Sequence, residues 1–92
     1  MSFKNRYEET FNFLGSWFPD MDYDDLTEER VVSNFKKTID KDHLNKVILE
    51  IKEIQDDIND YWEKIVQETN LYFEDANQVK QWLDLIISYL KE

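Results

Sequence analysis

The sequence has no cysteine, and it has only one glycine and one proline among its 92 residues. Without cysteine there are no disulfides, no cysteine-ligated zinc and no thiol nucleophile, which fits a reducing compartment. Because Gly15 is the only glycine, the chain cannot form a glycine-rich phosphate-binding loop. These absences exclude several common classes of enzyme and metal-binding domain.

Long apolar runs are also missing from the sequence. The longest run has three residues, whereas a helix that spans a bilayer needs about 20. The first six residues include two basic side chains with no apolar stretch behind them, so they do not form a secretory signal. We therefore expect a cytoplasmic protein that does not bind membranes.

The length of 92 residues suits one compact domain and is too short for two. We therefore expect a single helical domain over residues 1–92. Three Trp, five Tyr and six Phe can supply much of its core, and a catalytic cleft would compete for the same side chains. His43 is the only histidine, which leaves a multi-histidine metal site without its ligands. We expect neither enzymatic activity nor a cofactor.

The charge of the chain is strongly negative, since 11 basic and 21 acidic residues give 11 − 21 = −10. Such a field repels nucleic acid and anionic membranes, and it attracts basic proteins. A large negative charge also increases solubility by itself, so the total charge leaves both interpretations open.

Apolar residues recur every three or four positions, and no stretch alternates as a half-buried strand would. We predict helices over about residues 2–17, from Thr27 to before residue 40, over about residues 41–73, and from about Asp75 onward. An unbroken helix over 41–73 would be roughly 50 Å long, so we favour two helices with a break at residues 56–60. The predicted fold is all-α, a compact bundle of about five helices, or four if the central pair is continuous.

Several local signals refine these helices. Thr27 is a good N-cap, and Asp75 with Gln78 resembles a capping box for the last helix. Gly15 either ends the first helix or lets another helix approach closely. Tyr72 lies in phase with the apolar stripe of the central region and is assigned to it.

Carboxylates are concentrated between residues 20 and 29, where no basic residue is present. The segment begins as Asp-x-Asp-x-Asp, but the glycine and glutamate that a calcium-binding EF-hand loop needs are replaced by Asp25 and Val31. Carboxylates around aromatic and aliphatic side chains suit the binding of a basic protein surface. The partner-binding candidates in this segment are Asp20, Asp22, Tyr23, Asp24, Asp25, Glu28 and Glu29.

A second acidic surface is expected on the third helix, opposite its apolar stripe. This surface comprises Leu49, Glu50, Glu53, Asp56, Asp57 and Asp60. From it we select Leu49, Glu53 and Asp57 as further partner-binding candidates. Both acidic segments are also compatible with an ordinary solvated surface, the second more so than the first.

Segments near both ends of the sequence have distinctive aromatic and apolar patterns. The stretch Leu14-Gly15-Ser16-Trp17-Phe18-Pro19-Asp20-Met21-Asp22-Tyr23 precedes a helix with Val31, Val32 and Phe35. It resembles the opening signature of one family of contact-dependent growth inhibition (CDI) immunity proteins, roughly Leu-Gly-Gly-aromatic-Phe-His-Gln-Asp-aromatic. The aromatic pair Tyr72-Phe73 and the last helix, with Trp82-Leu83, Ile86 and Leu90, are similar to the end of that family. Ser16 and Pro19 depart from its pattern.

This resemblance implies a small cytoplasmic protein that binds and neutralises the C-terminal toxin domain of a large secreted effector. Such toxin domains are often nucleases, whose basic substrate grooves would suit an acidic inhibitor. Two other interpretations stay open. The chain can be an acidic regulatory or adaptor domain, such as a nucleic-acid mimic that binds a basic protein, or a small enzyme or metal-dependent module.

Overall fold

The computed structural model describes residues 7–19 and 27–92, and these residues form five α-helices and no strand. The helices are α2 (Glu8–Trp17), α3 (Glu28–Lys36), α4 (Lys41–Asp56), α5 (Ile58–Thr69) and α6 (Ala76–Lys91). The prediction of an all-α bundle of about five helices is confirmed.

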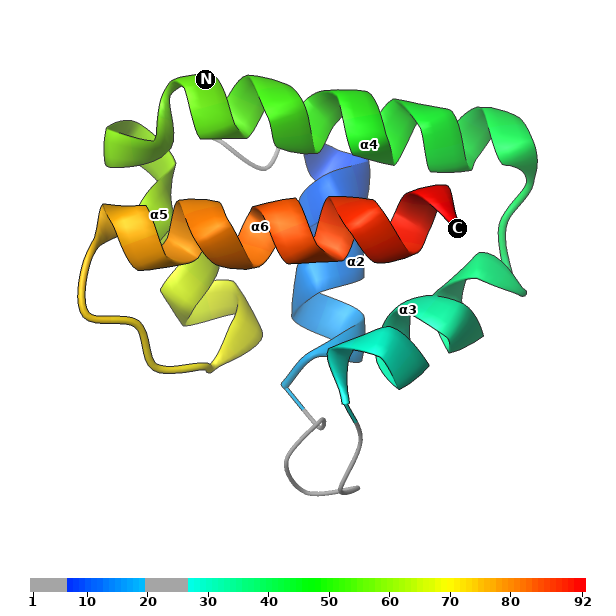
Figure 1. Cartoon of the computed structure of the whole chain (residues 1–92), viewed down its shortest axis with the longest axis horizontal. Coiled ribbons are helices and arrows are strands. Elements are labelled where there is room, and N and C mark those ends of the chain that lie inside the picture. The colour runs from blue at the N-terminus through cyan, green and yellow to red at the C-terminus, as the bar shows by residue number, and fades with distance from the viewer. Residues whose placement is uncertain (1–6, 20–26) are drawn as a thin grey trace.

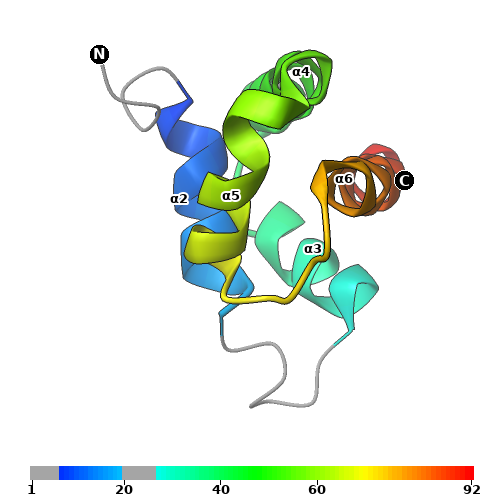
Figure 2. The ribbon, with the colours of Figure 1, turned by 90° about the vertical axis from the view of Figure 1, so that its left-hand side faces the viewer.

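The helices are arranged in two crossing groups. Figure 1 shows α4 and α6 side by side and running in opposite directions, with α2 and α5 crossing them steeply and α3 beside the end of α6. Figure 2 shows α4 and α6 nearly end-on, with α2 and α5 packed along one side of them. The described helices therefore surround one common core.

Apolar faces at helical spacing form that core. On the first helix, Tyr7, Phe11, Leu14 and Phe18 are all buried, as their spacing of three and four residues predicts. The adjacent edge of this helix is also covered, because Phe13 stacks on Phe35 of α3 with ring centroids 4.1 Å apart. On the other helices the fully buried side chains include Val31, Val32, Ile51, Ile54, Ile65, Leu83, Ile86 and Leu90.

The helix starts follow local capping chemistry. The Thr27 side chain accepts a hydrogen bond from the Arg30 amide, and the Asp75 side chain accepts one from the Gln78 amide. The reciprocal bond of Gln78 comes from the amide of Glu74 rather than from that of Asp75. Both predicted N-caps are therefore confirmed, and the capping box is displaced by one residue.

The first helix begins later than its apolar spacing predicts. Tyr7 has φ −124° and ψ 46°, which is not helical, so α2 starts at Glu8. The predicted residues 2–6 lie outside the described part of the chain. The helix continues through Gly15, where an added Cβ would lie 2.8 Å from Oε2 of Glu68 on α5. Of the two roles considered for Gly15, the close approach of another helix is the one observed.

The central region consists of two helices, as we favoured. Asp57 leaves helical geometry with φ −118° and ψ 36°, and it separates α4 from α5. A single helix over residues 41–69 would be roughly 44 Å long, whereas the largest dimension of the molecule is 30 Å. The break lets α5 turn back along α2, as both figures show.

The assignment of Tyr72 to the buried stripe is wrong. The chain leaves α5 at Asn70, whose φ of 58° is left-handed, and the helical phase ends there. Tyr72 consequently points into solvent with 84% of its surface exposed.

Candidate partner-binding surfaces

The first predicted acidic segment is described only at its C-terminal end. Asp20, Asp22, Tyr23, Asp24 and Asp25 lie outside the described residues. Glu28 and Glu29 form the first turn of α3, where carboxylates interact favourably with the positive end of the helix dipole.

Glu28 is partly used by the fold itself. Its Oε2 accepts a hydrogen bond of 3.1 Å from the indole nitrogen of Trp82 on α6. The same indole packs edge-to-face on Phe18, with centroids 5.0 Å apart, and on Phe73, with centroids 5.5 Å apart. Trp82 thus contacts the residues on both sides of segment 20–26, and Glu29 remains exposed beside them.

The second predicted surface lies on the outer side of α4. Leu49 is 60% exposed, and Glu53 and Asp57 are exposed at intervals of four residues along the same side. A hydrophobic side chain thus stands in line with two carboxylates. All three candidates selected from this surface are accessible to a partner.

Glu50 does not belong to this surface, which corrects our expectation. It is only 7% exposed, and it accepts a hydrogen bond of 2.7 Å from the hydroxyl of Thr10 on α2. The reason is geometric, because Val47 and Ile54, three residues before and four residues after Glu50, place it beside the apolar stripe.

The other carboxylates of this region gather where α4 meets α5. We call Glu53, Asp56, Asp57 and Asp60 the acidic junction. All four are exposed, and none forms an ion pair with any residue that the structure describes. A hollow of about 420 Å³ lies at this position, lined by Gln55, Asp56, Asp57, Ile58, Asn59, Asp60 and Lys80.

The position of Glu53 and Asp56 opposes the stability of α4. The C-terminal end of a helix carries a partial negative charge, which favours cations and disfavours carboxylates. The last turn of α4 contains these two carboxylates and no basic residue. No ion pair with a described residue offsets these two charges, whereas a basic partner would.

A groove between α2 and α4 was not predicted from the sequence. It has a volume of about 380 Å³ and is lined by Glu9, Asn12, Phe13, Ser16, Trp17, Phe35, Thr38, Ile39, His43 and Val47. Its α2 wall includes Phe13 and Trp17, which are four residues apart on one side of the helix. The opposite wall comes from residues 18 or more positions further along the chain, so no local pattern indicates it.

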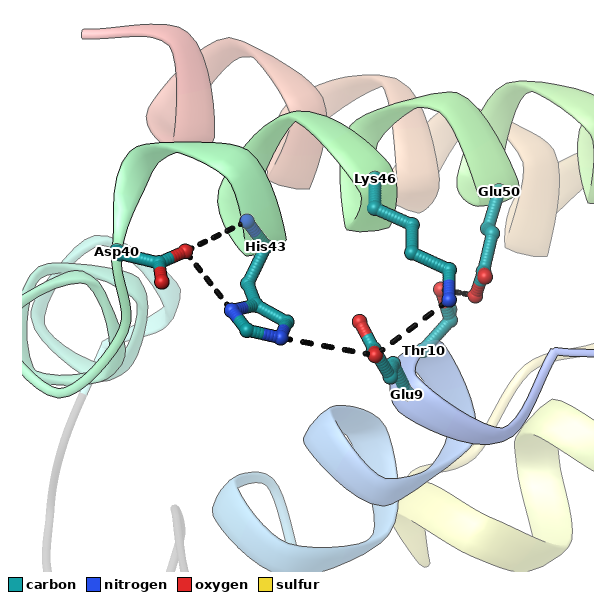
Figure 3. Close-up of polar contacts among 6 residues, drawn as sticks. All are labelled: Glu9, Thr10, Asp40, His43, Lys46 and Glu50. Carbon is teal, nitrogen blue, oxygen red and sulfur yellow. Dashed lines mark hydrogen bonds and ion pairs between the residues drawn. The ribbon is translucent and has the colours of Figure 1, made fainter.

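Polar contacts cross one end of this groove and join α2 to α4 (Figure 3). The nitrogen Nζ of Lys46 lies 3.5 Å from Oε1 of Glu9, and Nε2 of His43 lies 3.9 Å from the same oxygen. The N-cap residue Asp40 accepts a hydrogen bond of 2.8 Å from the His43 amide, and Nδ1 of His43 lies 2.8 Å from the same Asp40 oxygen. We call Glu9, Asp40, His43 and Lys46 the polar bridge.

Hydrogen bonding shifts one titration in the polar bridge. The backbone amide of His43, and then its ring, lower the pKa of the Asp40 carboxyl below its usual value of 3.8. The contact therefore favours the ionised form of Asp40. Of the two carboxylates in this bridge, Asp40 caps α4 and Glu9 joins α2 to α4.

No arrangement for metal chemistry is found in the described ranges. Residues 7–19 and 27–92 contain no cluster of three or more histidine, aspartate or glutamate side chains placed to hold a metal ion. No helix of these ranges has the length and apolar character needed to cross a membrane.

Comparison of this chain with known proteins gives no match. The chain matches no protein-family model, no curated protein sequence and no solved structure.

Proposed function

We propose that this chain is a cytoplasmic immunity protein that binds and neutralises a basic toxin domain of a contact-dependent growth inhibition effector. The toxin domain of such a pair is a nuclease in this proposal, because a nuclease has the basic groove that an acidic protein can cover. The chain acts by binding and has no catalytic role of its own.

The acidic junction is the observation that carries the proposal. Four exposed carboxylates lie within eight residues, and none has an ion-pair partner among the described residues. Two of them stand at the end of a helix where they disfavour folding. Exposed Leu49 adds an apolar contact on the same side of α4.

The mechanism follows from these charges. The net charge of −10 accelerates the encounter with a basic groove, and the acidic junction then pairs with the cations that would otherwise bind substrate phosphates. The bound chain also blocks access to the groove. Inhibition therefore combines electrostatic pairing and steric exclusion.

The resemblance to the immunity family supports the fold more directly than the role. Its motif residues Leu14, Phe18 and Leu83 are completely buried, so they stabilise the core rather than contact a partner. The same charges would suit an adaptor that binds another basic protein. The neighbouring gene separates the two proposals, because an immunity gene lies directly downstream of its effector gene.

The test is a calorimetric titration with the toxin domain encoded next to this gene, at low and at high salt. We expect tight binding that weakens as salt rises, since exposed charges are screened. Absence of binding at low salt would contradict the immunity function.

Two matched variants locate the surface. Asp56→Asn with Asp60→Asn neutralises half of the acidic junction, and Asp42→Asn with Glu92→Gln removes the same charge from exposed positions at the start of α4 and the end of α6, away from the junction (Figure 1). We expect the first variant to associate more slowly and bind more weakly than the second. Equal effects would show that only the total charge matters and would remove the junction from the interface.

A further inference from the structure

The strongest unexplained feature outside the acidic junction is the exposure of Tyr72. It is the most exposed large hydrophobic side chain of the described residues, at 84%, although its neighbours Leu71 and Phe73 both pack against the core. The chain therefore holds the residues on either side of Tyr72 and leaves Tyr72 itself in solvent.

The connection that carries Tyr72 is fixed at both ends. On one side, the Thr69 hydroxyl donates to the Ile65 carbonyl at 2.8 Å and accepts from the Leu71 amide at 3.3 Å. On the other, the Glu74 amide donates to the Gln78 side chain at 2.9 Å. A side chain displayed from a fixed backbone loses little conformational entropy on binding.

Helix α5 links this connection to the acidic junction. Figure 2 faces α5, with the α4–α5 junction at its upper end and the connection to α6 at its lower end. The exposed residues of its outer face are Asn59, Asp60, Glu63, Gln67 and Asn70, spaced as one helical side. No basic residue occurs between Lys64 and Lys80. The outer face is thus a polar and acidic strip, and Tyr72 follows two residues after Asn70 at the end of this strip.

We infer that the acidic junction, the outer face of α5 and Tyr72 form one interaction surface, in which Tyr72 is the aromatic anchor that enters a pocket on a basic protein. This inference rests on the proposed function and specifies its interface. Tyrosine is enriched among the residues that dominate binding energy, because its ring buries a large area and its hydroxyl can donate a hydrogen bond.

The size and the charge of the surface favour this occupant. Helix α5 is roughly 18 Å long, and an interface of about 800 Å² on each partner reaches both of its ends. A second copy of this chain would bring two acidic strips together, which like-charge repulsion disfavours. A basic partner pairs with Asp60, Glu63, Glu74 and Asp75 while the tyrosine ring is buried.

The experiment compares wild type, Tyr72→Ala and Leu85→Ala in binding to the toxin domain encoded next to this gene. Leu85 on α6 is a matched control, because it is 41% exposed and lies outside the strip. We expect Tyr72→Ala to raise Kd by about 30-fold or more, mainly through faster dissociation, and Leu85→Ala to change it by less than about threefold. Circular dichroism of both variants checks that the fold is retained.

Each of the other outcomes would overturn the inference. Unchanged affinity of Tyr72→Ala, with wild type still bound, overturns the anchor and leaves the proposed function standing. No binding by wild type overturns the proposed function and the anchor with it. A concentration-dependent dimer in sedimentation that Tyr72→Ala converts to a monomer assigns Tyr72 to self-association and overturns the inference.

Discussion

Helix α4 has carboxylates near both of its ends, and only the group near its start has hydrogen-bond or ion-pair partners among the described side chains. At its start, Asp40 caps the helix and contacts His43, and Glu9 of α2 meets Lys46 and His43 in the polar bridge. At its end, the four carboxylates of the acidic junction have no such partners among the described residues. One helix therefore uses charge for its own packing at one end and presents unpaired charge at the other.

The difference teaches that a high acidic content alone does not indicate binding. Glu50, one turn before Glu53 on the same helix, lies beside the apolar stripe and is buried against Thr10, whereas Glu53 is exposed. What separates the two groups is whether a hydrogen-bond donor or a basic side chain is within reach. Stability and binding experiments should therefore respond to different carboxylates.

The largest expected effect is on the core that supports both ends of α4. Leu83 is completely buried, so Leu83→Ala should reduce the free energy of unfolding by about 2–5 kcal/mol, through lost apolar burial and the cavity left behind. Urea unfolding followed by circular dichroism measures it. Unchanged stability would contradict the buried face of α6 and the arrangement on which the comparison depends.

The next largest effect separates Glu50 from Glu53. Glu50→Ala leaves the buried Thr10 hydroxyl without its acceptor, which should lower the free energy of unfolding by about 1–3 kcal/mol. Glu53→Ala on the exposed side should stay within about 0.5 kcal/mol of wild type. Equal losses in urea unfolding would show that both residues serve the fold.

Local chemistry explains which parts of the fold could be predicted from the sequence. The N-caps at Thr27 and Asp75 depend on neighbouring residues only, so they are visible in the sequence. The break at Asp57 follows from the small size of the domain together with the weak helix formers at residues 56–60. The predictions for Glu50 and Tyr72 were wrong because they depend on a distant residue or on an unusual backbone conformation. The acceptor position of Glu50 depends on a hydroxyl 40 residues away, and the exposure of Tyr72 depends on a left-handed Asn70.

Some of the candidate surfaces could likewise be predicted from the sequence, and others could not. The outer face of α4 could be predicted because exposure follows helical spacing, and Leu49, Glu53 and Asp57 all lie on it. The α2–α4 groove and the strip that joins the acidic junction to Tyr72 could not. They combine separate helices or extend past a helix end, where periodicity carries no information.

A smaller effect of opposite sign tests whether the acidic junction opposes folding. Glu53→Gln with Asp56→Asn removes carboxylates from the negative end of α4, so each change should increase the free energy of unfolding by about 0.3–1 kcal/mol at low salt. Asp60→Asn should instead decrease it, because Asp60 lies in the first turn of α5. The measurement is urea unfolding at low and at 1 M salt, where screening should reduce both effects. A loss of stability in the first variant would show that the junction supports the fold.

The smallest expected effect is a pH dependence of stability that arises from Asp40 in the polar bridge. The folded pKa of Asp40 is below its usual value of 3.8, so the folded state binds this proton less readily than the unfolded chain does. The contribution of Asp40 is therefore fully present above pH 4 to 5 and is lost as pH falls through its folded pKa. Asp40→Asn should be less stable than wild type at pH 7, and the difference should close at the acid end of the titration. Urea unfolding of both proteins from pH 7 down to about pH 2.5 measures this difference. A difference that is constant with pH would mean that Asp40 acts only as a neutral cap, and that its charge does not stabilise the start of α4.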